Sequence, residues 1–199
     1  IYFGLYKTIR SFISKKWHVI SISEAVKQVV ETRIGVQPSH SHLLFNAIPG
    51  LEISKKTDVK NDKTIKILFV GRLTKAKSIT TLLEAIKELQ NRRLNEKFVL
   101  EIIGDGELRK ALENKVKNLD IENLVLFKGN KNNVDKYYQE SDIFVLPSIW
   151  EGFGIVILEA FRAKLAIIAS NIEGPSELIE DQENGLLFEP KNSIQLAYK

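Results

Sequence analysis

The pattern of hydrophobic residues becomes regular from residue 65 onward. Short apolar runs alternate there with longer stretches in which apolar residues recur at helical spacing. The apolar runs predict strands at 65–70, 98–103, 124–127, 142–146, 165–170 and 185–188. The amphipathic stretches predict helices at 78–94, 107–119, 134–140, 154–163 and 175–180. Because strands and helices alternate through short turns, this part is expected to form a Rossmann-like, doubly wound parallel sheet, which is an α/β fold.

The start of the chain shows a different pattern. Residues 1–16 have apolar and basic residues on opposite helical faces, which predicts an amphipathic helix that packs on a protein domain or lies on a membrane surface. Residues 17–22 and 43–45 are expected to be strands, and a helix capped by Ser23 is expected over 24–32. These elements predict a βαβ unit.

The next segment separates these two patterns. Residues 52–64 are rich in lysine, aspartate, asparagine and threonine and offer little to bury. We therefore expect three parts: the end of a truncated N-terminal domain at 1–51, a linker at 52–64 and the α/β domain at 65–199. The sequence starts with isoleucine and contains no methionine, so we expect it to be a piece of a longer protein.

Composition narrows the classes of function. Hydrophobic residues make up 44% of the chain, which is enough for a substantial core. The absence of cysteine excludes disulfides, zinc–thiolate sites and thiol nucleophiles. The 29 basic and 25 acidic residues leave a formal charge of +4, which favours anionic partners only weakly. No basic block is interleaved with aromatic residues, so nucleic acid is not an expected partner. No apolar run reaches the roughly 20 residues of a membrane-spanning helix.

Two histidines raise the question of a metal site. His40 and His42 alternate along the chain and could share one face of a strand as a metal pair. The sequence offers no third ligand nearby, so solvated histidines are the favoured interpretation. No metal site is therefore expected.

The turns after the predicted strands are the places to search for a site, because open α/β sheets bind ligands at the carboxyl ends of their strands. After the first strand, Gly71 begins a loop that carries Arg72 and Lys77. A guanidinium fork and an ammonium could together neutralise a diphosphate, or both could be solvated loop residues.

The next two turns are also rich in glycine. Gly104 and Gly106 begin like a dinucleotide-binding fingerprint, but Arg109 stands where its third glycine belongs. These glycines indicate that the backbone comes close either to a ligand or to the neighbouring turn. After the third strand, Lys128 and Gly129 form a tight polar turn that could lie beside a nucleobase.

The densest group of candidate residues lies between the fourth strand and the helix that follows it. Glu151 lies in the turn, where Gly152 and Gly154 flank Phe153, and the helix start that follows favours an anion. Glu159 comes eight residues after Glu151, which is about 12 Å along a helix axis at ~1.5 Å per residue. The carboxylates of a retaining glycosidase stand only ~5 Å apart, so this spacing instead suits two acceptors at the ends of an extended ligand with a diphosphate between them. Taken singly, Glu151 could be a helix-start carboxylate and Glu159 a solvated helix residue.

In this order and at this spacing, the motifs resemble the C-terminal donor-binding half of retaining GT-B glycosyltransferases of family 4, also called glycosyl transferases group 1. The resemblance covers residues 17–199, and its beginning is similar to the end of the acceptor-side domain of that family. The segments that carry it are 71–73, 82–85, 104–106, 127–129, 141–148, 151–154, 158–160, 168–170 and 184–188.

The resemblance implies roles for individual residues. Arg72 and Lys77 would stabilise the departing nucleoside diphosphate. Glu151 would face the hydroxyls of the donor sugar, and Glu159 would hold the ribose. The expected catalytic residues are thus Glu151, Arg72 and Lys77. The other expected donor- or nucleotide-binding residues are Gly71, Gly104, Gly106, Lys128, Gly129, Phe153, Gly154, Ile155 and Glu159.

The resemblance also implies an activity. A sugar would pass from a nucleotide-sugar donor to an acceptor hydroxyl with retention of anomeric configuration, in polysaccharide or glycolipid synthesis, without a metal or cofactor. A UDP-sugar is favoured over a GDP- or ADP-sugar, and the acceptor would be a carbohydrate or a lipid-linked molecule. The protein would be cytoplasmic or would lie at the cytoplasmic face of a membrane, with peripheral contact through the missing N-terminal domain. The fragment alone would be inactive.

The sequence departs from the family pattern at five positions. Ser78, Ala47, Glu173 and Lys164 replace glycines, and Ala166 replaces a proline. Two other classes of protein remain open at this point. A non-catalytic nucleotide-binding module would be expected to have lost the charged residues named above, and a sugar-nucleotide epimerase would be expected to have an N-terminal dinucleotide fingerprint.

Overall fold

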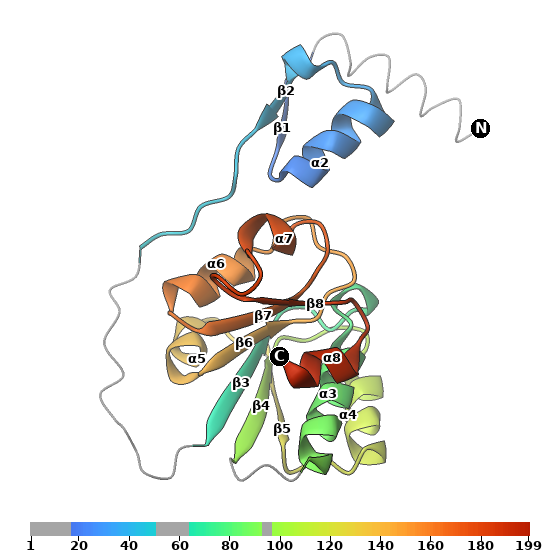
Figure 1. Ribbon diagram of the computed structural model, residues 1–199, viewed down its shortest axis with the longest axis vertical. Coiled ribbons are helices and arrows are strands. Elements are labelled where there is room, and N and C mark those ends of the chain that lie inside the picture. The colour runs from blue at the N-terminus through green and yellow to red at the C-terminus, as the bar shows by residue number, and fades with distance from the viewer. Residues whose placement is uncertain (1–16, 51–63, 93–96) are drawn as a thin grey trace, which may run out of the picture. The chain divides into compact units, whose positions relative to one another are not determined.

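The computed structural model describes residues 17–50, 64–92 and 97–199 (Figure 1). The chain divides into two compact units, residues 1–47 and 48–199, which are described separately. The helix expected over 1–16 and nearly all of the linker expected over 52–64 lie outside the described residues.

The first unit contains the expected βαβ arrangement. Strands β1 (Val19–Ser21) and β2 (Ser41–Leu43) pair in parallel, with helix α2 (Glu24–Val29) between them. Ser23 caps α2 as predicted, because its Oγ accepts a hydrogen bond from the backbone N–H of Val26 at 3.1 Å. The second strand was expected two residues later. Its pairing ends where β1 ends, which fixes β2 as a three-residue strand.

The second unit is built on a six-stranded sheet, and all of its paired strands are parallel. The strand order is β5-β4-β3-β6-β7-β8. The strands are β3 (Ile65–Val70), β4 (Phe98–Ile103), β5 (Val125–Gly129), β6 (Ile143–Leu146), β7 (Ala166–Ser170) and β8 (Leu186–Phe188). The helices are α3 (Ile79–Asn91), α4 (Arg109–Asn118), α5 (Asp135–Glu140), α6 (Ile155–Arg162), α7 (Pro175–Leu178) and α8 (Ser193–Tyr198). This architecture confirms the expected doubly wound α/β fold.

The helices cover both faces of the sheet. Figure 1 shows α3, α4 and α8 grouped on one side of the sheet and α5 and α6 on the other. The central strand β3 is correspondingly apolar, and Leu68 and Phe69, which point to opposite faces, are both fully buried. Burial on both faces explains why the strands appear in the sequence as continuous apolar runs.

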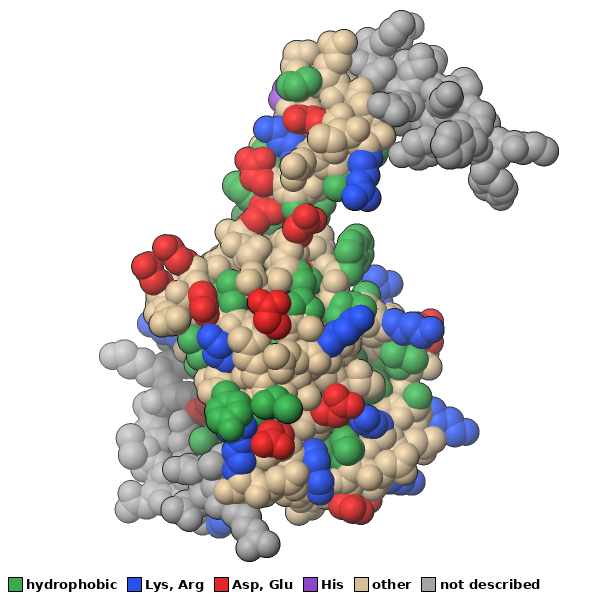
Figure 2. Space-filling model, turned by 45° about the vertical axis from the view of Figure 1, so that its right-hand side comes forward, with side chains coloured by type: hydrophobic (Ala, Val, Ile, Leu, Met, Phe, Trp, Pro, Cys, Tyr) green, Lys and Arg blue, Asp and Glu red, His purple; other side chains and the backbone are tan. Residues whose placement is uncertain are grey.

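Two short elements of this unit were not predicted. A 3-10 turn, Lys75–Lys77, lies in the loop after β3. Helix α8 begins after Asn192, whose side-chain oxygen accepts a hydrogen bond from the backbone N–H of Gln195 at 2.9 Å. Within the described ranges, each helix is too short or too polar to cross a bilayer. On the face shown in Figure 2, basic and acidic side chains are interspersed over the second unit.

Candidate functional site

Two loops meet at the carboxyl edge of the sheet. The loop after β3 carries the 3-10 turn, and the loop after β6 leads to α6. Because β3 and β6 are neighbouring parallel strands, both loops leave the sheet at the same edge. The backbone N–H of Ile149 donates a hydrogen bond to the carbonyl oxygen of Ala76 at 2.8 Å. This bond joins the loop that carries the expected cations to the loop that carries the first expected carboxylate.

Lys77 and Glu151 form a direct ion pair across these two loops. The Nζ of Lys77 donates to Oε2 of Glu151, and each side chain is only 17% exposed. The sequence-based prediction placed both residues in one site, and the structure brings them together. An ammonium can neutralise a phosphate, and an ionised carboxylate accepts hydrogen bonds from hydroxyl groups. The pair therefore places a cation that could bind a phosphate beside a carboxylate that could accept from hydroxyl groups.

The glycines of the first two turns are explained by the packing of one turn on the other. A Cβ at Gly104 would lie 2.0 Å from the carbonyl oxygen of Gly71, and a Cβ at Gly106 would lie 2.7 Å from that of Leu73. The backbone N–H of Gly104 also donates to the carbonyl oxygen of Gly129 at 2.9 Å. Of the two explanations open from the sequence, close approach to a neighbouring turn thus accounts for Gly104 and Gly106. Their expected contact with a nucleotide stays a prediction.

The turn around Glu151 packs against a neighbouring loop on one side and has free space on another. A Cβ at Gly174 would lie 2.7 Å from the carbonyl oxygen of Glu151, so a glycine lets the loop after β7 pack against this turn. A Cβ at Gly152 would meet no atom within 4 Å, so the turn leaves free space beside it. Phe153 is buried, and Gly154 adopts a left-handed conformation, φ 94°, immediately before α6.

The first residue of α6 is exposed at this edge. Ile155 is 44% exposed and begins the helix. The first backbone N–H groups of a helix have no carbonyl partner within the helix, and they favour a negative charge. The start of α6 thus offers backbone donors in the loop that also carries Glu151.

Glu159 lies further along α6 and contacts a residue that the sequence did not single out. The hydroxyl of Tyr138 on α5 donates to Oε2 of Glu159 at 2.8 Å. Tyr138 is 1% exposed, and its burial, together with the negative charge of Glu159, raises the pKa of its hydroxyl. The hydroxyl therefore stays protonated and donates. Periodicity places Tyr138 in a helix, but only the packing of α5 against α6 reveals its partner.

The other two expected cations, Arg72 and Lys128, make no hydrogen bond to Lys77 or Glu151 in the described part of the chain. Arg72 is exposed, and its side chain makes no hydrogen bond or ion pair within the described residues. The Nζ of Lys128 lies 3.3 Å from a carboxylate oxygen of Glu101, which is buried in β4. Lys128 therefore neutralises a buried carboxylate, which the sequence did not predict. The roles of Arg72 and Lys128 in nucleotide binding stay predictions.

Arg109 illustrates why the dinucleotide fingerprint is incomplete. Its guanidinium lies over the ring of Phe127, 4.7 Å from the ring centroid, and its Nε donates to Glu113 at 2.5 Å. Arg109 thus joins the start of α4 to β5 and to the next turn of its own helix. These contacts give it a structural role where the fingerprint has a glycine.

The histidines are arranged differently from the expected pair. His40 lies in a 3-10 turn, Pro38–His40, and not in a strand, because the proline at 38 starts a helical turn. His42 instead bonds to His18, with 2.6 Å between the two ring nitrogens, and the two rings stack. Across the ranges described, no group of three or more histidine, aspartate or glutamate side chains is arranged to hold a metal ion.

Two of the departures from the family pattern occupy strained backbone positions. Ser78, which follows the 3-10 turn, has φ 45°, and Lys164, which follows α6, has φ 59°. Both values lie in the left-handed region, where residues other than glycine are disfavoured. This conformation explains why the family pattern has a glycine at these two positions.

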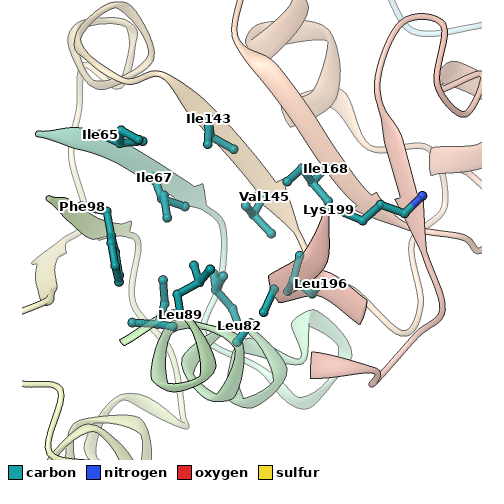
Figure 3. A pocket seen from close by; sticks show the side chains of 13 residues that line it. Ile65, Ile67, Leu82, Leu89, Phe98, Ile143, Val145, Ile168, Leu196 and Lys199 are labelled. Atoms are coloured by element: carbon teal, nitrogen blue, oxygen red, sulfur yellow. The ribbon is translucent and has the colours of Figure 1, made fainter. Parts of the chain in front are cut away.

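An apolar cavity lies away from these residues. Figure 3 shows side chains of β3, β6 and β7 facing those of α3 and α8 around a space of about 320 Å³. The lining includes Ile67, Val145, Ile168, Leu82 and Leu196, and its charged member is Lys199. None of the predicted site residues lines this cavity, and its aliphatic walls do not suit a phosphorylated ligand.

Comparison with known proteins identifies the protein family to which this chain belongs. The family described as glycosyl transferases group 1 matches residues 52–199. An uncharacterised glycosyltransferase of Methanocaldococcus jannaschii is 32% identical over 194 residues, which is 90% of this chain and 49% of that protein. The Escherichia coli UDP-Gal:alpha-D-GlcNAc-diphosphoundecaprenol alpha-1,3-galactosyltransferase is 31% identical over 197 residues, which is 93% of this chain and 51% of that protein.

Solved structures agree on the fold. Anabaena HepE in complex with UDP and glucose has a TM-score of 0.82 at 21% identity, over 97% of this chain and 55% of that one. A glycosyltransferase from Rickettsia africae has a TM-score of 0.81 at 24% identity, over 98% of this chain and 55% of that one. The α/β fold expected from the sequence is the fold of these glycosyltransferases.

The chain belongs to the glycosyl transferases group 1 family. The resemblance found in the sequence is thereby confirmed at the level of the family. The chain spans about half the length of the curated relatives it matches, 49% and 51% for the two named above.

Proposed function

We propose that this chain is the donor-binding half of a retaining family 4 glycosyltransferase, which moves a sugar from a nucleotide-sugar to an acceptor hydroxyl. The observation that carries the proposal is the Lys77–Glu151 ion pair, held at the carboxyl edge of the sheet by the bond between Ile149 and Ala76. One member suits the diphosphate and the other suits the hydroxyls of the sugar beside it.

The reaction assigns a task to each group. The acceptor oxygen forms a bond to the anomeric carbon while the bond from that carbon to the diphosphate oxygen breaks. The electron pair leaves with the nucleoside diphosphate, and the proton of the acceptor passes to a phosphate oxygen on the same face of the sugar, so the configuration is retained. Lys77 and Arg72 stabilise the charge that develops on the diphosphate, and Glu151 holds the sugar hydroxyls. No metal ion or cofactor takes part.

The proposed donor is a UDP-sugar. The Escherichia coli relative is named for a UDP-galactose donor, and HepE was solved with UDP. The proposed acceptor is a lipid-linked carbohydrate, in line with the undecaprenyl diphosphate acceptors named for the Escherichia coli relative and for a Campylobacter jejuni relative that is 34% identical over 161 residues. The enzyme would then work at the cytoplasmic face of a membrane, through contacts of a further, N-terminal domain.

The 199-residue chain is expected to bind the donor without transferring sugar. It spans about half of its curated relatives, and a catalytic cleft between two α/β domains needs groups from both. Robust sugar transfer by this chain alone would contradict the proposal that catalysis needs a second domain.

Calorimetric titration with UDP, GDP, ADP and NAD tests the proposal. Binding of UDP in preference to the other three supports it. Preference for NAD would favour a dinucleotide-binding module instead, and failure of all four ligands to bind would remove the basis of the proposed site.

A further inference from the structure

We propose that Tyr138 is a positioning residue, which orients the carboxylate of Glu159 so that it recognises the ribose hydroxyls of a bound nucleoside diphosphate. The role rests on the proposed function, and it takes from the family resemblance the expectation that Glu159 holds the ribose. It concerns how strongly the site prefers a ribonucleotide to a deoxyribonucleotide.

The contact between the two residues is specific. Tyr138 lies on α5 and Glu159 on α6, and the tyrosine hydroxyl donates to Oε2 at 2.8 Å. The ring of Tyr138 packs against Phe144 of β6, with 5.7 Å between the ring centroids. The ring is 1% exposed, so strand and helices fix its position. A donor that cannot move holds the carboxylate in one orientation.

The carboxylate keeps a second oxygen for a ligand. Tyr138 engages Oε2, while Oε1 of Glu159 has no hydrogen-bond donor within the described residues. Each carboxylate oxygen can accept two hydrogen bonds, so Oε1 suits the two adjacent hydroxyls of a ribose. Because the hydroxyl of Tyr138 is buried beside a carboxylate, its pKa is raised and it stays protonated. The hydroxyl has two acceptors, Oε2 of Glu159 at 2.8 Å and the backbone carbonyl oxygen of Val156 at 3.5 Å, and the shorter bond goes to the carboxylate. Tyr138 therefore acts as a donor to Oε2 and leaves Oε1 for the ligand.

A purely structural explanation competes with this role, because the same bond also connects α5 to α6. The two helices have a second connection, however. The Nη2 of Arg162 on α6 donates to Oδ1 of Asp135 on α5 at 2.7 Å, and the arginine side chain is only 16% exposed. A Tyr138→Phe variant keeps this ion pair and the buried ring, so the helices should remain packed while Glu159 loses its donor.

The chain offers a matched control on the same helix. Tyr137 precedes Tyr138 on α5 and packs at the edge of the core, but its hydroxyl makes no hydrogen bond in the described part of the chain. Tyr137→Phe removes the same atom from the same helix without touching Glu159. A general effect of losing a tyrosine hydroxyl from α5 would therefore appear in both variants.

The test compares UDP with 2′-deoxy-UDP and 3′-deoxy-UDP by calorimetry. We expect wild type and Tyr137→Phe to prefer UDP, and Tyr138→Phe to lose most of that preference, roughly tenfold for one hydrogen bond to a charged group. The affinity of Tyr138→Phe for the deoxy forms should fall less than its affinity for UDP, because each deoxy form keeps only one of the two hydroxyls that Glu159 would hold. Glu159→Gln, which keeps the size of the side chain, should lose the preference too, because the preference acts through the carboxylate. If Tyr138→Phe fails to fold, a crystal structure of wild type with UDP tests the role: we expect Tyr138 on Oε2 and a ribose hydroxyl on Oε1 of Glu159, and a ribose away from Glu159 would overturn it.

Three results would overturn the role of Tyr138. In the first, wild type binds UDP and the deoxy forms equally. In the second, Tyr138→Phe loses affinity for all three ligands to the same extent. In the third, Tyr138→Phe keeps the wild-type preference, as Tyr137→Phe does. In each of these cases the proposed function stands, because UDP still binds. If wild type binds none of the nucleotides, the proposed function itself fails and the role of Tyr138 fails with it.

Discussion

Lys77 and Glu151 form an ion pair although 74 positions separate them in the sequence. The fold brings them together because the strands that precede them, β3 and β6, are neighbours at the centre of the sheet. Each charge is largely shielded from water, so each depends on the other until an anionic ligand competes for the ammonium. We therefore expect the loss of Lys77 to weaken diphosphate binding more than the loss of any other cation of this loop.

Replacing Lys77 with alanine should weaken UDP binding roughly tenfold or more, because it removes a phosphate partner and leaves the charge of Glu151 unpaired near the ligand. Lys75→Ala is the control, since Lys75 lies on the same turn and is exposed. Isothermal titration of both variants with UDP gives the comparison. Equal losses for the two would mean that only the general charge of the loop matters.

Two glycines near Glu151 should respond differently to alanine. Gly174→Ala should lower the free energy of unfolding by about 2 kcal/mol, because φ is 90° and the new Cβ would press on the carbonyl oxygen of Glu151. Gly152→Ala should change it by less than about 0.5 kcal/mol, because its Cβ would enter open space. Urea unfolding of both variants measures the difference, and similar values would show that the turn is not packed as described.

Ser78 and Lys164 offer a gain in stability. Each adopts a left-handed conformation that costs a residue with a side chain roughly 1–2 kcal/mol, while glycine adopts it freely but loses more entropy on folding. Lys164→Gly should therefore raise the free energy of unfolding by up to about 1 kcal/mol. Ser78→Gly should gain less, because it also removes the hydrogen bond between the hydroxyls of Ser78 and the buried Thr81, which lie 3.0 Å apart. A thermal unfolding midpoint that falls for both variants would contradict this account of the two departures.

The buried hydroxyl of Tyr138 should make stability depend on alkaline pH. Its pKa is raised above the ordinary value of 10.0 in the folded protein, so the folded state keeps a proton that the unfolded chain releases above that pH. The stability advantage of wild type over Tyr138→Phe should therefore be constant below pH 10.0 and shrink by up to about 1.4 kcal/mol per pH unit above it. Urea unfolding between neutral pH and pH 11 compares them, roughly one unit past the ordinary tyrosine pKa. A constant difference throughout would show that the hydroxyl is not shielded.

The sequence predicted the strands and helices of this protein better than it predicted the contacts between side chains. Strands β3 and β4 fall at the predicted residues, because a sheet covered on both faces requires continuous apolar runs. Helix α8 was not predicted because its six residues are too few to establish a helical period. The glycine turns were recognised, but whether Gly104 and Gly106 made room for a ligand or for a neighbouring turn depended on the packing of two loops.

The candidate site shows the same limit. Lys77 and Glu151 were placed in one site by the rule that loops at one edge of a sheet converge, combined with the family resemblance. The partners of Glu159 and Lys128 were not predicted, because they come from a neighbouring helix and a neighbouring strand. Such contacts depend on side-chain directions across the sheet, which periodicity along one segment does not encode.

A crystal structure of the chain with UDP tests the central claim most directly. The account predicts diphosphate oxygens about 2.7–3.2 Å from Nζ of Lys77, and the ribose hydroxyls at the same distance from Oε1 of Glu159. The start of α6 should face the diphosphate between them. A UDP molecule bound elsewhere on the chain, with both Lys77 and Glu159 free of contact, would contradict the account.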